Sequence, residues 1–91
     1  MLKITTQTGA TGTIFELEGK LAGLWVQELE GCWQRLVIRD QPVKVVLKAV
    51  TFIDDAGRKL LAALHRQGAE LAAEGFMMKA IVAEIMRGED L

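Results

Sequence analysis

The sequence predicts a small α/β domain with a mixed sheet of about four strands and helices packed against it. The first twenty residues contain stretches that alternate apolar and polar side chains, as half-buried strands do. Residues 22–37 then place apolar side chains at helical spacing, and residues 43–50 are rich in β-branched types. A second helical pattern follows, and a helix between two parallel strands requires a right-handed crossover. With 91 residues, the chain is predicted to form a single domain, residues 1–91.

The first two strands are expected to form an antiparallel hairpin. In LKITT, residues 2–6, and in TIFELEG, residues 13–19, apolar side chains alternate with polar ones. The segment ATGT at 10–13 lies between them and reads as a turn, because glycine supplies a permissive backbone.

Residues 22–37 are predicted to form a helix with one apolar stripe facing the sheet. Trp25 and Trp33 both fall on that stripe, which indicates core packing. Cys32 shares the stripe and is expected to behave as a small buried hydrophobe.

The next strand and helix are predicted at residues 43–48 and 57–73. The strand is apolar on both faces, and such strands are usually covered on both sides or parallel to their neighbours. Gly68 would then lie in the middle of the helix and allow a close approach to a strand. Gly75 would be the C′ residue that ends it.

The last part of the chain is ambiguous between strand and helix. We expect a strand from Phe76 to about Ile81, in which Met77 and Met78 fill the core, and then a short helical turn ending at Gly88. The predicted order is ββαβαβ with a stub.

The composition argues against several classes of function. A pI near 5.8 and a net charge of −1 argue against nucleic-acid binding. One cysteine and one histidine give no disulfide and no thiolate or imidazole metal cluster, so no metal or cofactor is expected. Ser and Tyr are absent, which removes the commonest hydroxyl nucleophiles and argues against an enzyme. Without a signal peptide or an apolar run of about 18 residues, we expect a cytoplasmic protein with no membrane insertion.

Two adjacent carboxylates, Asp54 and Asp55, lie where the apolar strand passes into the second helix. Aspartate is a strong N-cap, because its carboxylate accepts a hydrogen bond from a helix N–H that has no other partner. The second carboxylate would gain from the positive end of the helix dipole. Acid–base hydrolysis, in contrast, needs two carboxylates that face one bond from separate positions. We therefore expect this turn to serve as architecture and docking surface.

The order of elements, taken with VVLKAVTFIDDAGRKLLAAL at 45–64, resembles the STAS domain family, named for sulfate transporters and anti-sigma factor antagonists. The shared motif is an Asp-x-x-Gly turn between an apolar strand and a Leu-rich helix. FELEGKLAG at 15–23 is similar to the family's second strand and the Gly-Leu segment after it. The resemblance implies a mixed sheet flanked by helices and a regulatory module without catalysis. It also implies a protein partner, a serine kinase that acts as an anti-sigma factor.

One position departs from the family pattern. The kinase phosphorylates a hydroxyl residue just before the motif glycine, and here Ala56 precedes Gly57. Phosphorylation adds about −1.5 to −2 charge, which Ala56 cannot receive, whereas Asp55 supplies a smaller fixed charge. A binding module that phosphorylation does not switch is therefore the first reading. The alternative is a STAS-like accessory subunit of a lipid-transporting ABC ATPase, where the acceptor serine is not needed.

A protein partner is expected to contact the motif turn and the start of its helix. The expected contacts are Asp54, Asp55, Ala56, Gly57, Arg58 and Lys59, with Ala62, His65 and Arg66 as further contacts on the outer helix face. A merely solvated helix face is the alternative for this surface. Family members commonly have a full final helix that this tail is expected to lack. An uncovered sheet face would favour association with another chain, so a homodimer is expected.

Overall fold

A computed structural model describes residues 1–37 and 42–88 of the chain, without the side chains of residues 36 and 37. The elements follow in the order β1 (Leu2–Gly9), β2 (Gly12–Leu21), α1 (Leu24–Val37), β3 (Val43–Ile53), α2 (Asp55–Arg66), β4 (Glu70–Ala73) and α3 (Phe76–Met86). The predicted α/β class is confirmed. The last residues of the tail, 89–91, lie outside the described residues.

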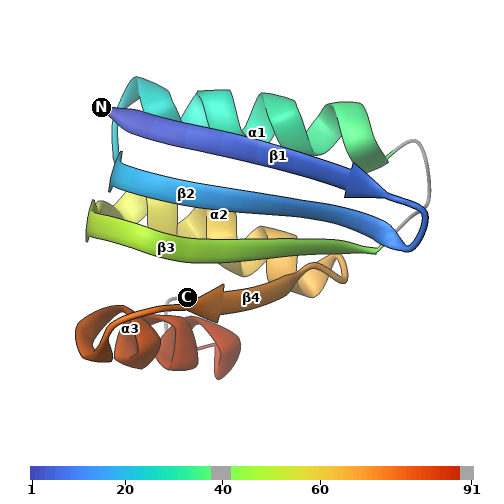
Figure 1. Cartoon of the computed structure of the whole chain (residues 1–91). Helices are drawn as coiled ribbons and strands as arrows, with labels where there is room; N and C mark the ends of the chain where they lie inside the picture. Colours follow the sequence, from blue (N-terminus) through green and yellow to red (C-terminus); the bar gives the residue numbers. More distant parts are fainter. Residues whose placement is uncertain (38–41, 89–91) are drawn as a thin grey trace.

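The four strands form one mixed sheet in the order β1-β2-β3-β4 (Figure 1). β1 and β2 are the expected antiparallel hairpin, while β3 runs parallel to both β2 and β4. The register places Phe15 beside Val45 and Val45 beside Leu71. These side chains therefore point to the same face, because side chains alternate along a strand.

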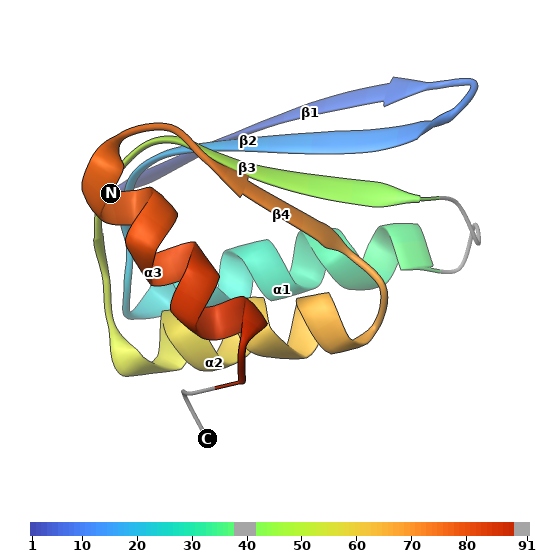
Figure 2. The same cartoon turned by 90° about the horizontal axis from the view of Figure 1, so that it is seen from below.

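The three helices lie on one face of the sheet (Figure 2). Phe15, Leu17 and Leu47 point toward them and are completely or almost completely buried, as is Leu61 of α2. Burial of each such side chain stabilises the fold by about 1.5–3 kcal/mol. Of the two alternatives expected for the apolar strand, β3 is parallel to both neighbours, while its other face carries the partly exposed Val46.

Helix α1 presents its apolar stripe to the core largely as predicted. Trp33 is buried, and its indole Nε1 donates a hydrogen bond to Oε1 of Gln67 at 3.2 Å, which ties α1 to the end of α2. Trp25 and Cys32 are only half-buried at the edge of the core.

Helix α2 ends seven residues earlier than predicted, at Arg66. Gly68 has a φ of +105°. The N–H of Gly68 donates to the carbonyl of His65, and the N–H of Ala69 donates to the carbonyl of Leu64. This pair of bonds is the Schellman motif, so Gly68 is the C′ residue of α2 and not a mid-helix residue.

The positions predicted for the last strand and the last helix are wrong because the end of α2 was predicted too late in the chain. Once α2 ends at Arg66, residues Glu70–Ala73 are free to form β4, and the segment predicted as a strand at 76–81 is part of α3. Met78 is buried on the inner side of this helix, whereas Met77 is exposed. The expected loss of the final helix is therefore wrong, and α3 packs against β4 and α2.

The carboxyl half of β3 is irregular. Its register with β2 shifts after Leu17 and again after Gly19, which leaves Lys48 and Thr51 as extra residues on β3. Such bulges bend a strand and re-aim its side chains. Buried side chains consequently fall at every third position here, at Leu47, Val50 and Ile53, and the strand leads directly into Asp54.

Candidate functional site

The turn between β3 and α2 is organised by the side chain of Asp54. Asp54 is the N-cap of α2, in an extended conformation, and its Oδ1 accepts a hydrogen bond from the N–H of Gly57 at 2.7 Å. This bond satisfies one of the helix N–H groups that have no partner within the helix. The sequence-based expectation that an aspartate caps this helix holds for Asp54.

The second oxygen of Asp54 reaches a different part of the chain. Its Oδ2 accepts a hydrogen bond from the N–H of Gly23 at 3.0 Å, 31 residues earlier in the chain, in the loop between β2 and α1. The N–H groups of Gly23 and Gly57 favour the charged carboxylate and hold the pKa of Asp54 below its ordinary value, against a smaller opposing effect of desolvation. Asp54 therefore links the turn between β3 and α2 to the loop between β2 and α1 through its two hydrogen bonds.

Position 57 requires glycine because neighbouring atoms leave no space for a side chain, and not because of its backbone dihedral angles. A Cβ at this position would lie 2.7 Å from the carbonyl oxygen of Leu21 and 2.9 Å from Cγ2 of Ile53. The first turn of α2 can approach the end of β2 only because residue 57 has no side chain. The glycine of the Asp-x-x-Gly motif thus sets the contact between helix and sheet.

The residues between Asp54 and Gly57 face solvent. Asp55 and Ala56 are both exposed, and so is Lys59 one turn further along. Both oxygens of Asp54 accept a hydrogen bond from a backbone N–H, whereas Asp55 projects toward solvent one residue further on. Within residues 1–37 and 42–88, no three His, Cys, Asp or Glu side chains are grouped to hold a metal ion.

Four further residues predicted to contact a partner differ in their surroundings. Arg58 is half-buried, and its Nη2 lies 3.0 Å from Oε1 of Glu84, so it joins α2 to α3. Ala62 is buried in the core, and the expectation that it lies on the outer face is wrong because α3 packs over that side of α2. His65 is half-buried, and its Nδ1 has no hydrogen-bond partner among residues 1–37 and 42–88. Arg66 is exposed.

Helices α1, α2 and α3 all begin at the same end of the sheet (Figures 1 and 2). Large apolar side chains at or just before these helix starts are exposed. Leu24 opens α1 directly after Gly23 and is 76% exposed, and Phe76 opens α3 and is 93% exposed. Phe52, two residues before Asp54, is 51% exposed. Sequence reasoning did not single out these residues, since an apolar side chain at a helix start reads as core unless the position of the helix is known.

The mixed four-stranded sheet and the capped turn at the start of α2 define a small α/β domain. The structure resembles the crystal structure of an anti-sigma factor antagonist from Mycobacterium paratuberculosis, with a TM-score of 0.77 and 20% sequence identity. The match covers 99% of this chain and 80% of the other chain. The resemblance stated from the sequence is thus confirmed for the fold.

No family model matches the chain, and no curated protein matches it. None of the helices in the described part of the chain has the length and apolar character that a membrane crossing requires.

Proposed function

We propose that this chain is a non-catalytic regulatory module that binds another protein through the Asp54 turn, in the manner of an anti-sigma factor antagonist. The observation that carries the proposal is the double hydrogen bond of Asp54. These two bonds hold the β3–α2 turn against the β2–α1 loop. Asp55, Ala56 and Lys59 are exposed on this ordered turn and on the start of α2. A surface that is ordered before it binds loses less conformational entropy on association.

The exposed apolar side chains support the same surface. Leu24 adjoins Gly23, whose N–H is bonded to Asp54. Apolar side chains next to a few charged ones are the usual make-up of a protein–protein contact. The structural neighbour supports the class of function, because it is an anti-sigma factor antagonist.

The proposed module is not switched by serine phosphorylation. Ala56 is exposed at the position before Gly57 and has no hydroxyl to accept a phosphate. The nearest hydroxyl is on Thr51, whose Oγ1 donates to the carbonyl of Gly19 at 3.4 Å. After incubation with a captured kinase partner and ATP, the intact mass of the protein is expected to stay unchanged. Phosphate on any residue of the turn would contradict this part of the proposal.

Affinity capture from native extract with quantitative mass spectrometry tests the binding surface. Lys59→Glu is expected to weaken capture of the partner about tenfold, as reversal of a contact charge commonly does. Arg35→Glu is the matched control, because Arg35 is also an exposed basic residue but lies in the last turn of α1 at the opposite end of the molecule. Arg58 is unsuitable because its substitution would also break the contact with Glu84. Equal capture by the wild type and Lys59→Glu would move the interface elsewhere.

The alternative partner is the ATPase of a lipid-transporting ABC system. The missing hydroxyl at Ala56 favours it, because a constitutive subunit needs no phosphate switch. The captured protein distinguishes the two readings: a serine kinase or anti-sigma factor supports the first, and a transporter ATPase supports the second. The genes that lie beside this one offer the same distinction at lower cost.

A further inference from the structure

The two outer edges of the sheet differ in how much free strand they offer. β4 forms one edge with four residues, Glu70–Ala73, and glycines of positive φ, Gly68 and Gly75, flank it. β1 forms the other edge with eight residues, Leu2–Gly9 (Figure 1). Proteins protect edge strands with short length, proline, bulges or charges, because the free backbone groups can pair with another chain. β1 has no proline and no shift of register against β2, and Lys3 is its only charged residue.

The bonds between β1 and β2 show which backbone groups of β1 face the free edge. In an antiparallel ladder, pairs of opposite residues that exchange two backbone hydrogen bonds alternate with pairs that exchange none. The N–H of Lys20 donates to the carbonyl of Met1 at 2.9 Å, and the two residues continue the register of Leu2 with Gly19. Odd-numbered residues of β1 therefore bond to β2, and the even-numbered ones direct their N–H and C=O groups toward the free edge. These residues are Leu2, Ile4, Thr6 and Thr8.

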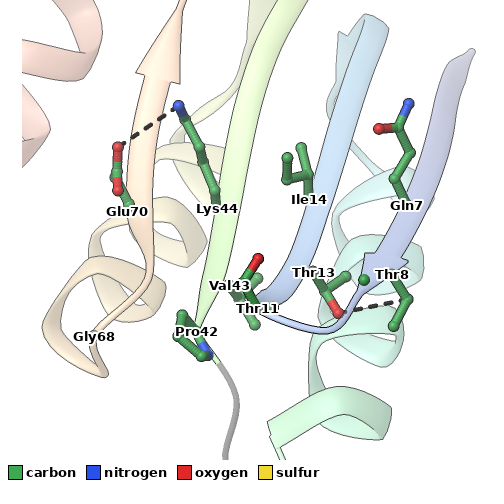
Figure 3. A pocket seen from close by; sticks show the side chains of 12 residues that line it. Gln7, Thr8, Thr11, Thr13, Ile14, Pro42, Val43, Lys44, Gly68 and Glu70 are labelled. Atoms are coloured by element: carbon green, nitrogen blue, oxygen red, sulfur yellow. Dashed lines mark hydrogen bonds and ion pairs between the residues drawn. The ribbon is translucent and has the colours of Figure 1, made fainter.

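The sheet stays regular up to this edge. Gln7, Ile14, Lys44 and Glu70 form one row across the four strands (Figure 3). In the described part of the chain, β1 contacts mainly β2, while α1 packs against β2 and α2 in the layer of helices (Figure 2). The outer side of β1 is therefore open to another strand.

We propose that the free edge of β1 pairs with β1 of a second copy of the same chain, in antiparallel orientation, so that the two sheets become one. The twofold axis is perpendicular to the sheet and places Thr5 opposite Thr5 of the second copy. Leu2 then lies opposite Thr8 of the second copy, and Ile4 opposite Thr6. Each of these pairs exchanges two backbone hydrogen bonds, so that the edge-facing N–H and C=O groups of all four residues are used.

This register is the one in which the edge is most complementary to itself. A shift by one residue would place edge-facing groups opposite groups that are already bonded to β2, and a shift by two would leave three hydrogen-bonded pairs in place of four. On the open face of the sheet, Lys3 lies opposite Gln7 of the second copy, so the two Lys3 side chains do not face each other. Threonines directly opposite each other, as at Thr5, stabilise strand pairing. The self-complementary register argues for a second copy of this chain as the occupant.

The proposed contact is small and separate from the partner surface at Asp54. A strand of eight residues is about 26 Å long, and pairing along one edge is near the lower limit for a specific interface. We therefore expect a dimer that forms only at high protein concentration. The Asp54 turn lies between β3 and α2, so a partner protein and a second copy could bind together.

Sedimentation velocity on the wild-type chain is the first test. Between about 10 μM and 1 mM protein, the weight-average mass is expected to rise from monomer toward dimer. A wild-type chain that stays monomeric over this range overturns the proposal.

Thr6→Pro tests whether the backbone of β1 makes the contact. Proline removes an N–H that faces the free edge and leaves the bonds of β1 to β2 in place, so the monomer should fold, as urea denaturation would verify. The variant is expected to dimerise at least about tenfold more weakly than the wild type. Thr6→Val is the matched control, because it retains the N–H and should dimerise as the wild type does. Wild-type association by Thr6→Pro overturns the proposal.

Charges introduced at Thr5 test the register. Thr5→Lys alone places two lysines opposite each other at the axis, and Thr5→Glu alone places two glutamates there, so each is expected to weaken the dimer about tenfold. An equimolar mixture is expected to recover the dimer, because a lysine at position 5 of one copy then faces a glutamate at position 5 of the other. Each variant has the same internal charges alone and in the mixture, so a change in folding cannot produce this recovery. No recovery in the mixture overturns the register.

Two further measurements separate this dimer from the binding of a partner protein. Lys59→Glu lies on α2 and is expected to leave the dimer unchanged while it weakens partner capture. Thr6→Pro is expected to capture the partner as the wild type does. A monomeric wild type whose partner capture is lost on Thr6→Pro would assign the edge to another protein and overturn the proposed dimer.

Discussion

Two junctions between a strand and a helix lie at the same edge of this sheet, and they are built differently. Where β3 passes into α2, Asp54 caps the helix with its side chain, and Gly57 lets the helix pack against the end of β2. Where β4 passes into α3, Gly75 has a φ of +91° and the helix start has no side-chain cap. Phe76, the first residue of α3, is almost fully exposed.

The difference concerns how many constraints define each helix start. The β3–α2 junction is held by bonds from Asp54 to two loops and by direct contact of Gly57 with Leu21. The β4–α3 junction depends mainly on a backbone conformation that glycine adopts easily. Regions with few buried contacts open more readily than the core. We therefore expect the Asp54 turn to be rigid and the start of α3 to open more often.

The largest effect is predicted for Gly57→Ala. The new Cβ would lie 2.7 Å from the carbonyl oxygen of Leu21, so α2 must move away from β2, at a cost of about 2–4 kcal/mol in the free energy of unfolding. Urea denaturation measures this loss. Gly31→Ala is the matched control: outside the helix backbone, the nearest described atom to its Cβ would be Nη1 of Arg35 at 3.7 Å, so the variant should be stabilised by up to about 1 kcal/mol. A Gly57→Ala protein as stable as the wild type would show that the close contact is not a constraint.

A smaller loss is predicted for Gly75→Ala. Apart from the residues on either side of it, no described residue has an atom within 4 Å of the position of the new Cβ. The cost therefore comes from the backbone, whose φ of +91° and ψ of 145° suit glycine. We expect a loss of about 1–3 kcal/mol. Amide hydrogen exchange checks where it acts: protection should fall in α3 and stay unchanged in the first turn of α2. Equal loss of protection in both helices would contradict the view that the two junctions are independent.

The two junctions also differ in how well the sequence predicts them. Asp54 and Gly57 are residue types with a direct physical meaning at a helix start, and the apolar run before them marks the strand. Cap, turn and strand could therefore be predicted. The bond from Asp54 to Gly23 could not be derived from spacing, since it joins residues 31 positions apart and depends on how β2 and β3 align.

The end of α2 and the start of α3 were misread because two glycines were assigned the wrong roles. Apolar side chains continue at helical spacing from Leu64 through Leu71, so the pattern did not show that Gly68 ends the helix. In the structure Leu71 is buried as part of β4. The segment from Phe76 fits both periods, and a strand of four residues is too short for periodicity to identify. The number and order of the strands could be predicted, but the boundaries of the last three elements could not.

We predict that the negative charge of Asp54 stabilises the β3–α2 junction, so that the stability of the fold depends on pH. Hydrogen bonds from Gly23 and Gly57 lower its pKa in the folded state. The stabilisation is thus fully present above the pKa that Asp54 has in the unfolded chain, which is about 4. It is lost as the pH falls through the lower pKa that Asp54 has in the folded state. Asp54→Asn retains one acceptor oxygen, but its amide nitrogen would face a backbone N–H. It should therefore unfold several degrees below the wild type at neutral pH.

Thermal unfolding between about pH 2 and 7 checks this prediction. The two melting curves should converge at acidic pH, because only the wild type loses the carboxylate. Asp55→Asn is the control, because it removes an exposed acidic charge one residue away and leaves both hydrogen bonds of Asp54 in place. A constant difference between Asp54→Asn and the wild type at every pH would assign the effect to shape and not to charge.

The smallest effect is predicted where the helices of the two junctions meet. Arg58 in the first turn of α2 lies 3.0 Å from Glu84 of α3, and their side chains are 25% and 44% exposed. A pair this accessible to water contributes at most about 1 kcal/mol. Glu84→Gln should therefore lower stability by less than either glycine substitution, and about 1 M salt should reduce the difference from the wild type. Glu28→Gln, on the exposed side of α1, controls for the loss of one acidic charge.

Because the ion pair between Arg58 and Glu84 joins α3 to the rigid junction, Glu84→Gln should also increase hydrogen exchange in α3 while exchange at the Asp54 turn stays constant. Increased exchange at both sites would mean that α3 supports the turn, and the two junctions would then have to be treated as one unit.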